Sequence, residues 1–406
     1  MLGPGLVTGA ADDDPSGIGT YSQVGAQFGY SMGWSLLFGF PLLVSIQAIC
    51  AEVGAVTGRG IAQNLKRHYP RRLLLGAVTM LLVANIINLG ADIGAMGAAM
   101  ALLVPGPALL FTVGFGVLSC ALEIFVSYDR YARLLKWSTL SLLSYVAVAF
   151  VAKVPVGEAL RGIAIPSFSF DKAHTMALVA VFGTTISPYL FFWQAAQEVE
   201  EQHRRHLRPL RFSRRTAPAE LSRIRTDTLV GMGFSHATAL FIMVATAATL
   251  HAAGVTQIES AAQAADALRP IAGDLAFALF ALGMIGTGLL AVPTLAGSAA
   301  YAVSECFGWK EGLSRKPREA KAFYGVIALA TLGGIGVNLL PIDPMQALYW
   351  AAVVNGLLAP PLMLLTMLIA RDPKVMGNLT IPRGLAIGGW ISTAVMAGVA
   401  VLFLVI

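Results

Sequence analysis

Three consecutive carboxylates, Asp12, Asp13 and Asp14, stand inside an otherwise apolar segment, and Pro15 and Gly17 follow them closely. A charged side chain at the centre of a bilayer costs about 2.5 kcal/mol or more, so such residues persist where they face a cavity, a partner or a ligand. Proline removes a backbone donor and glycine favours unwinding, which predicts a helix that breaks at DDDPSG. Carboxylates, together with the carbonyl groups freed at a break, can coordinate a cation. The sequence therefore predicts a cation site inside the membrane.

The alternative is that the aspartates lie in water at the membrane surface. Apolar sequence continues on both sides of them, LGPGLVTGAA before and YSQVGAQFGY after, which favours the buried site. Neighbouring side chains on a helix diverge by about 100°, so the three aspartates cannot all be direct ligands. Asp14 abuts the break and is the expected direct ligand. Asp13 lies behind it or joins if the helix unwinds early, and Asp12 pairs with another polar group.

A second apolar segment, residues 178–197, has a matching interruption around Thr184, Ser187 and Pro188. These side chains offer hydroxyl groups and no sulfur. Oxygen ligands suit hard cations such as Mg²⁺ and Mn²⁺, whereas thioethers favour softer metals. Two broken helices at corresponding places in two halves predict a five-plus-five inverted repeat with its substrate between the breaks.

Other polar side chains lie within apolar spans. Asn85, Asn88 and Asp92 are about one helical turn apart, so they line one face of a helix. They form either a polar or proton pathway, with Asp92 and Asn88 as the candidates, or hydrogen bonds that hold helices together. Asn355 is a further candidate for the cation site.

The composition is that of a polytopic membrane protein. Of the 406 residues, 56% are hydrophobic and 12% charged, and the mean hydropathy is +0.71. Soluble domains carry about 25% charged residues, so a soluble enzyme is excluded. A membrane helix needs about 20 apolar residues. We count eleven such stretches, at residues 2–30, 33–58, 73–104, 108–127, 135–152, 174–197, 227–251, 274–303, 323–341, 346–370 and 384–406.

The predicted fold is therefore all-α, with broken first and sixth helices. Residues 1–152 are expected to form the first repeat, 174–370 the second, and 384–406 an additional eleventh helix.

Positive residues collect in cytoplasmic loops. With a cytoplasmic N-terminus, the outside loops hold Lys153, Arg161, Lys172 and Arg269, and the other 24 of the 28 Lys and Arg residues lie inside. The C-terminus is then outside the cell membrane. The basic run 201–215 resembles a nucleic-acid patch, but in a cytoplasmic loop it is expected to meet anionic lipid headgroups. The expected partners are a cation substrate and the bilayer, with no nucleic acid and no obligate protein partner.

Five motifs in the same order resemble the Nramp family of divalent-metal transporters. They are GPGLVTGAADDDPSG with GAQFGY, QAICAEVGAVTGRGIAQNLKRHYP, TISPYLFFWQ, ALGMIGTGLLAVPTLAGSAAYAVSECF and LAPPLMLLTMLIARDPKVMG. The resemblance covers nearly the whole chain. It implies the inverted-repeat fold named for the bacterial leucine transporter and a divalent metal as substrate.

The resemblance also implies departures at the metal site. Asp14 corresponds to the family's metal-binding aspartate, but Gly17 stands where the family has asparagine. Ser187 replaces the methionine of the sixth helix. Asn355 lies near a glutamine that helps to close the site in the family.

Further departures concern proton movement. Tyr189 and Gln194 align with two histidines that the family uses for proton movement and gating. They are therefore further candidates, with Asp12, for the proton or polar pathway. An acidic pair of the third helix is reduced to Asp92, with Leu89 at the other position. This pattern resembles a divergent Nramp-related branch that includes magnesium and manganese transporters without strong proton coupling.

The expected function is import of Mn²⁺ or Mg²⁺, with Fe²⁺ as a further candidate, by alternating access with weak or absent proton coupling. No GxxxxGK[ST] loop is present, so ATP-driven pumping is not expected, and neither is enzymatic activity. The metal is substrate, and no cofactor is expected. Two alternatives stay open: a Na⁺- or H⁺-coupled symporter of a small organic solute on the same fold, and a non-transporting metal sensor.

Overall fold

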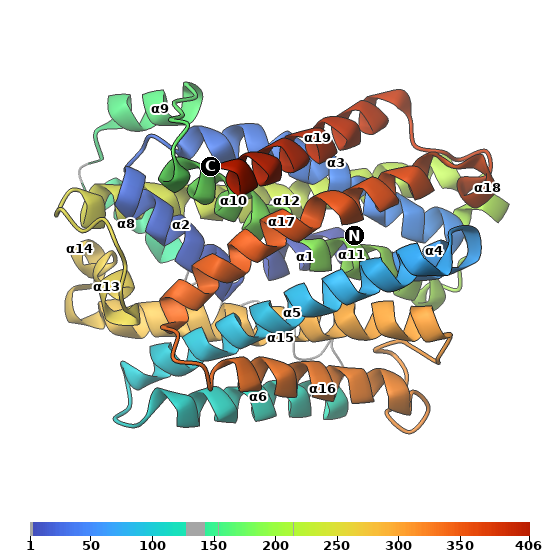
Figure 1. Cartoon of the computed structure of the whole chain (residues 1–406), viewed down its shortest axis with the longest axis horizontal. Helices are drawn as coiled ribbons and strands as arrows, with labels where there is room; N and C mark the ends of the chain where they lie inside the picture. Colours follow the sequence, from blue (N-terminus) through green and yellow to red (C-terminus); the bar gives the residue numbers. More distant parts are fainter. Residues whose placement is uncertain (1–2, 127–142, 153, 214) are drawn as a thin grey trace.

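The computed structural model describes residues 3–126, 143–152, 154–213 and 215–406, and within them it contains helices and no β-strand (Figure 1). The first predicted break is confirmed. Helix α1 spans Pro4–Asp12 and α2 spans Pro15–Phe28, with Asp13 in a non-helical conformation at φ −79° and ψ 53°. Pro15 opens α2, where its missing N–H is harmless and its fixed φ suits a helix. Asp14 caps that helix by accepting a hydrogen bond from the Gly17 N–H.

The second break is also confirmed. Helix α10 spans Lys172–Thr185 and α11 spans Pro188–Arg204, separated by Ile186 and Ser187. Proline disfavours the helical conformation in the residue before it, and Ser187 is extended at φ −75° and ψ 133°. The α10–α11 segment is the most enclosed of the membrane-length spans, with 94% of its most apolar window buried.

The remaining long helices fit most of the predicted spans. Within the described residues, eight helical segments are long and apolar enough to cross a membrane, and the joined α10–α11 segment is one of them. The other seven are α3 (Gly33–Thr57), α5 (Arg71–Ala101), α6 (Ala108–Phe125), α12 (Ala217–Thr246), α15 (Ala276–Phe307), α17 (Pro344–Arg371) and α19 (Arg383–Val405). The π-helical turn η3 (Ala247–His251) extends α12, and η4 (Gly273–Leu275) precedes α15.

Three predicted spans are not among these eight. The halves of the first helix are each short, and α16 (Lys321–Val337) is an apolar helix of 17 residues. The predicted span 135–152 lies partly outside the described residues, and its described part is α8 (Leu143–Val151). The division into repeats at residues 152, 174, 370 and 384 stays a prediction.

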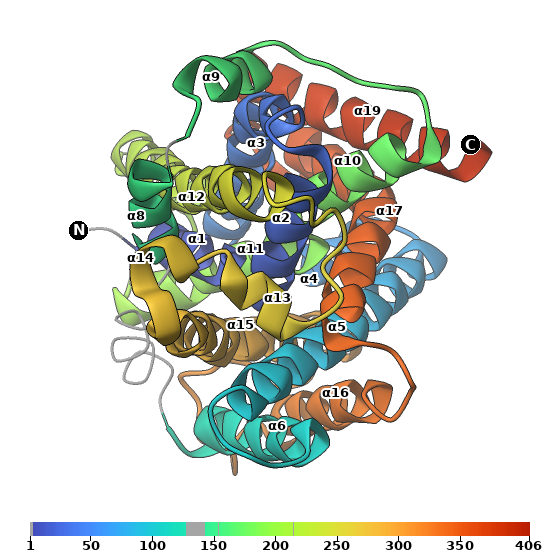
Figure 2. The same cartoon turned by 90° about the vertical axis from the view of Figure 1, so that its left-hand side faces the viewer.

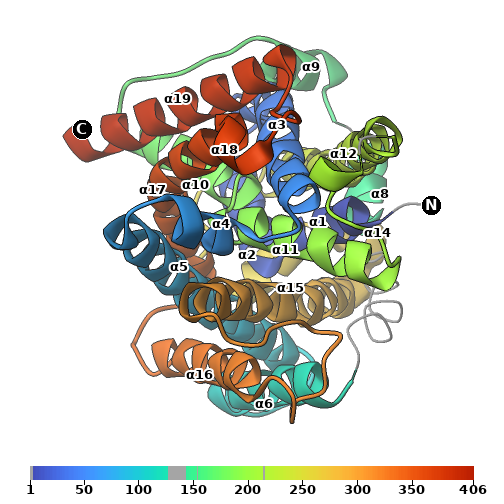
Figure 3. The same cartoon turned by 90° about the vertical axis from the view of Figure 1, so that its right-hand side faces the viewer.

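The broken helices lie in the middle of the bundle (Figure 2). They are contacted by α3, α12, α15 and α17. Helix α5 packs on α15 and α17. Helices α6 and α16 form an outer layer against α5 (Figure 3). Short helices lie between the spans: α4 (Ile61–His68), η2 (Leu210–Phe212) and α18 (Pro373–Met376) on predicted inside loops, and α9 (Val156–Ala164), α13 (Ala261–Asp266) and α14 (Arg269–Ala272) on predicted outside loops. Figure 1 shows α4 and α18 at one end of the molecule and α9, α13 and α14 at the other.

Glycines allow α1 to lie directly on α12. A Cβ atom added at Gly9 would stand 2.2 Å from the Gly231 carbonyl oxygen, and one added at Gly231 would stand 2.2 Å from the Gly5 carbonyl oxygen. Only residues without a side chain permit this approach of two backbones. The contact fixes the helix that carries the aspartates.

Candidate metal-binding site

All three aspartates at the first break are buried, with exposed fractions of 1% for Asp12, 3% for Asp13 and 1% for Asp14. They point to different partners. Asp12 and Asp13 contact α12, whereas Asp14 faces the start of α2 and α11. The alternative of an aspartate run in water at the surface is therefore wrong for this fold.

Asp14 lies where the two broken helices meet. Its Oδ1 atom accepts a hydrogen bond of 2.6 Å from the Gly17 N–H, and its Oδ2 atom accepts one of 3.1 Å from the Tyr189 hydroxyl. The same hydroxyl is 3.2 Å from the carbonyl oxygen of Ala11 in the last turn of α1. A carboxylate oxygen and a backbone carbonyl oxygen thus face one point beside the break, and both are ligand types that hard cations use.

Asp12 and Asp13 share a partner that the sequence reading did not identify. The Ser235 hydroxyl is 2.7 Å from Asp12 Oδ2 and 3.0 Å from Asp13 Oδ1, so one hydroxyl hydrogen serves two carboxylates. The remaining oxygens, Asp12 Oδ1 and Asp13 Oδ2, have no hydrogen-bond partner among the described residues. A signal was available, because Asp227, Gly231 and Ser235 recur every four residues and form a polar and small face on α12.

Asp92 of α5 joins the same region through the backbone. Its Oδ1 atom accepts a hydrogen bond of 3.2 Å from the Ser16 N–H, and the Ser16 hydroxyl donates to the carbonyl of Leu348 in α17 at 3.2 Å. Asn85 donates to the Leu295 carbonyl of α15 at 2.9 Å, which is the helix-joining role. Neither amide atom of Asn88 has a partner in the described part of the chain.

At the second break the hydroxyl groups differ in how they are used. The Ser187 hydroxyl lies 2.8 Å from the carbonyl oxygens of both Gly183 and Thr184, so its hydrogen is used by the last turn of α10. The buried Thr184 hydroxyl has no partner among the residues described. Thr184 is therefore the freer of these two groups.

Two predicted site residues make no bond to Asp14. Asn355 Nδ2 and both amide atoms of Gln194 are buried without a hydrogen-bond partner in the described ranges. The structure thus brings Asp14, Gly17 and Tyr189 together and links Asp92 to the break, and within the described residues it shows no hydrogen bond from Asn355 or Gln194 to that group.

The site has carboxylates without cationic partners. Among the described residues, no Lys or Arg forms an ion pair with any aspartate at the break or with Asp92. The described side chains also contain no group of three or more His, Cys, Asp and Glu residues arranged to hold a metal. A cation here would thus be held by one or two carboxylates together with carbonyl, hydroxyl and water oxygens, the donor set in which Mg²⁺ keeps part of its water.

A cavity of about 520 Å³ lies beside α2, and neither Asp14 nor Tyr189 is among its lining residues. Its lining includes Gly19 of α2, Gln23 and Tyr349. Gln23 ties α2 to the segment before α13, which also lines this cavity, because its amide accepts a hydrogen bond from the Ile258 N–H at 2.8 Å and donates to the Thr256 carbonyl at 3.2 Å.

Comparison with known proteins identifies the family. The sequence matches the family model described as Nramp, natural resistance-associated macrophage protein-like, over residues 5–406. The chain belongs to the Nramp family. Nramp proteins are transporters, so it is a multi-pass membrane transporter and not an enzyme.

Curated Nramp relatives span most of the chain. It is 26% identical to a protein of Klebsiella pneumoniae (strain 342) named divalent metal cation transporter MntH, over 98% of this chain and 91% of that one. It is 25% identical to a protein of the same name from Mesorhizobium japonicum, over 98% and 86% of the two chains.

Solved structures show the same fold. A manganese transporter of Eremococcus coleocola superimposes with a TM-score of 0.77 at 17% identity, over 100% of this chain and 85% of that one. MhsT in complex with L-phenylalanine gives 0.66 at 15% identity over 98% of both chains. Inward-facing Mhp1 gives 0.59 at 13% over 99% and 90%. The predicted five-plus-five fold, with its broken first and sixth helices, is confirmed.

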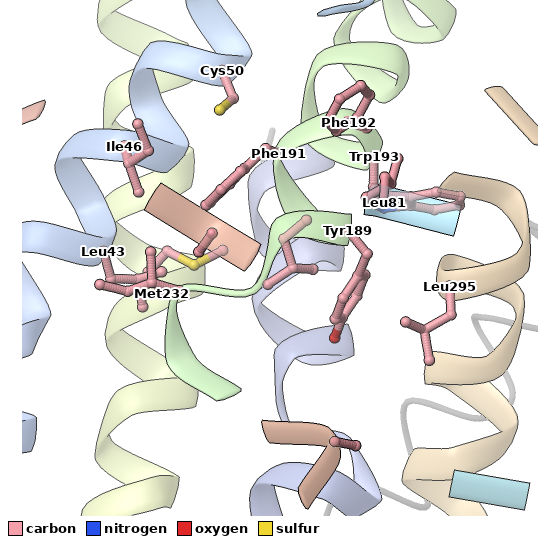
Figure 4. Close-up of a cluster of buried hydrophobic side chains, with 14 of the residues drawn as sticks. Leu43, Ile46, Cys50, Leu81, Tyr189, Phe191, Phe192, Trp193, Met232 and Leu295 are labelled. Carbon is pink, nitrogen blue, oxygen red and sulfur yellow. The ribbon is translucent and has the colours of Figure 1, made fainter. Parts of the chain in front are cut away.

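Side-chain packing in this Nramp protein fixes the second break (Figure 4). Figure 4 shows Tyr189 pointing away from Phe192 and Trp193, which follow it on α11. Tyr189, Phe191 and Trp193 are among the largest fully buried side chains. The Tyr189 carbonyl also accepts a hydrogen bond of 2.9 Å from the Ser298 hydroxyl of α15. The first turn of α11 is therefore held rigidly beside Asp14.

Proposed function

We propose that this protein imports divalent cations, Mn²⁺ or Mg²⁺ with Fe²⁺ as a further candidate, across the cell membrane by alternating access. The observation that carries the proposal is the convergence of Asp14 and the Ala11 carbonyl at a helix break that no Lys or Arg of the described chain neutralises. A buried carboxylate without a cationic partner is costly, and a bound cation offsets that cost. The names of the MntH relatives and of the Eremococcus coleocola transporter support the same substrate class.

The proposed ligands are oxygen atoms. Asp14 and the Ala11 carbonyl are the proposed direct ligands, and Thr184 and water supply further oxygen atoms. Asp13 and Ser187 lie farther from the cation and do not bind it directly. Gly17 contributes its N–H to Asp14 and no side chain, and the Tyr21 ring lies beside it, 3.3 Å from where a Cβ atom would stand. Asn355 of α17 is proposed to approach when the site closes. Oxygen donors favour Mg²⁺ and Mn²⁺ over softer metals.

Transport is proposed to depend weakly or not at all on protons. Tyr189 and Gln194 stand where the family resemblance places two histidines, and neither side chain changes charge near neutral pH. The membrane potential alone favours entry of a divalent cation by about 4.6 kcal/mol per 100 mV, which is twice the value for one charge. Import therefore requires no second ion. The N-terminus is proposed to be cytoplasmic and the C-terminus external.

The test is Mn²⁺ influx into proteoliposomes with and without excess Mg²⁺. We expect Asp14→Asn, which keeps a helix-capping side chain, to reduce influx to background, and Asp266→Asn, a half-exposed residue of α13, to leave it unchanged. Suppression of influx by Mg²⁺ would support a hard-cation carrier. Influx that Asp14→Asn does not change would contradict the site. No influx in the wild-type protein would make an organic-solute symporter or a metal sensor the next hypothesis.

A further inference from the structure

The Tyr189 hydroxyl stands between the two oxygens to which the proposed cation would bind. It is 3.1 Å from Asp14 Oδ2 and 3.2 Å from the Ala11 carbonyl oxygen, and the tyrosine is 1% exposed. A phenol has one hydrogen, so it serves both acceptors in turn or shares that hydrogen between them. One side chain of α11 thereby ties the end of α1 to the start of α2.

This position is incompatible with a cation bound to the same two oxygens. Cations of the Mn²⁺ and Mg²⁺ class lie about 2.0–2.2 Å from their oxygen ligands, and the donated hydrogen of the phenol would point at the positive charge. The hydroxyl group must move or turn before the cation binds. The Ser298 hydroxyl holds the backbone of Tyr189 at 2.9 Å, so we take the movement to be one of the side chain and not of α11.

We propose that the Tyr189 hydroxyl takes the place of the cation in the metal-free carrier and is displaced when the cation binds. This inference rests on the proposed function and concerns a step that the function leaves unexplained. A carrier without a coupled ion must return with its site empty, and Asp14 is then a buried carboxylate with no cationic side chain beside it. The hydrogen bond from Tyr189 stabilises Asp14 during that return.

Tyr189→Phe separates this role from that of a metal ligand. Without the hydroxyl, the cation no longer competes with a hydrogen bond for Asp14, so the Kd for Mn²⁺ falls about ten- to a hundredfold, as expected for one hydrogen bond to a charged group. Net Mn²⁺ influx falls because the empty return is slow. Exchange of Mn²⁺ across the membrane, which needs no empty return, stays within about twofold of the wild-type protein.

The controls test packing and folding. Tyr324→Phe removes another buried tyrosine hydrogen bond, 2.9 Å to the Arg315 carbonyl and remote from the break, and should change neither Kd nor the ratio of exchange to net influx. Ser298→Ala keeps the Tyr189 hydroxyl but loosens the backbone of Tyr189. The Kd for Mn²⁺ and the net influx should therefore both fall, by less than in Tyr189→Phe, and this variant tests the inference even if Tyr189→Phe does not fold.

The outcomes that overturn the inference are distinct. A higher Kd together with slower exchange in Tyr189→Phe would make the hydroxyl a ligand. An unchanged Kd and an unchanged ratio of exchange to net influx in Tyr189→Phe would mean that the hydroxyl has no part in the transport cycle. A wild-type protein that neither binds nor exchanges Mn²⁺ would overturn the proposed function itself, and this inference with it.

Discussion

Asp227 of α12 accepts a 2.7 Å hydrogen bond from the N–H of Gly5 in the first turn of α1. It accepts a second of 2.7 Å from the Gly3 N–H. One turn earlier, Arg223 forms an ion pair of 3.0 Å with Glu198 of α11. Helix α12 therefore anchors the same end of both broken helices. Alternating access moves such helices against the rest of the bundle, so these bonds should break when the site opens at this end.

Asp227→Ala should loosen α1. Loss of a side chain that caps a helix N-terminus costs about 1–2 kcal/mol, so the Tm should fall. A cysteine introduced at Thr8, which is buried in α1, should also react faster with a maleimide when Asp227 is replaced, in a background without the native cysteines. Asp266→Ala serves as control. An unchanged labelling rate would mean that α1 is held by its other contacts.

Gly9→Ala should destabilise the contact of α1 with α12. The added methyl would stand 2.2 Å from the Gly231 carbonyl oxygen, and overpacking of this kind costs about 1–3 kcal/mol. Gly398→Ala in α19 is the matched control, because a Cβ there meets nothing within 4 Å and alanine favours a helix by about 1 kcal/mol. The two variants should therefore shift Tm in opposite directions. Equal Tm shifts in Gly9→Ala and Gly398→Ala would show that α1 can move away from α12 without loss of stability.

The sequence predicted both helix breaks because proline acts locally. Pro15 and Pro188 each open a helix, and the residue before each is extended. Pro293 stands inside the continuous helix α15, so the polar residues that precede Pro15 and Pro188 were the other part of the signal. The burial of Asp14 was equally predictable, since apolar sequence flanks it. These features depend on neighbours along the chain.

Contacts between distant segments were not predictable. Ser235 is 223 positions from Asp12 in the sequence, and nothing near either residue names the other. Tyr189 was predicted as part of a polar pathway, yet its hydroxyl contacts Asp14 directly, because the two breaks meet only after both halves pack. Asn355 and Gln194, chosen by the family resemblance, have no hydrogen bond to the carboxylates of the site in the described structure.

Ser235→Ala should affect stability more than transport. Asp12 and Asp13 would lose their shared donor, and a buried acceptor left without a partner costs about 1–3 kcal/mol. Ser235 has no bond to Asp14, so Mn²⁺ influx should stay within about threefold of the wild-type rate. Ser392→Ala, whose hydroxyl bonds to backbone in a distant helix, is the control. Loss of influx with a normal Tm would instead make Ser235 part of the cation path.

Glu311 should make stability depend on pH. It lies between α15 and α16 beside a cavity of about 630 Å³ that Glu200 also lines. Burial, and then the charge of Glu200, raise the pKa of Glu311 from 4.5 to about 7, against the opposing charges of Arg315 and Lys66. The folded protein therefore holds a proton that the unfolded chain has lost between these two values.

Because the folded state binds more protons, stability falls as the pH rises from about 4.5 through 7. Glu311→Gln has no proton to lose, so its Tm should fall less than that of the wild-type protein between pH 5.5 and pH 8. Thermal unfolding in detergent at the two pH values measures this difference. Glu319→Gln, an exposed residue in the same connection, should keep the wild-type dependence. If Glu311→Gln also keeps the wild-type pH dependence of Tm, other groups cause that dependence. The Glu311 carboxylate is then already solvated in the folded protein.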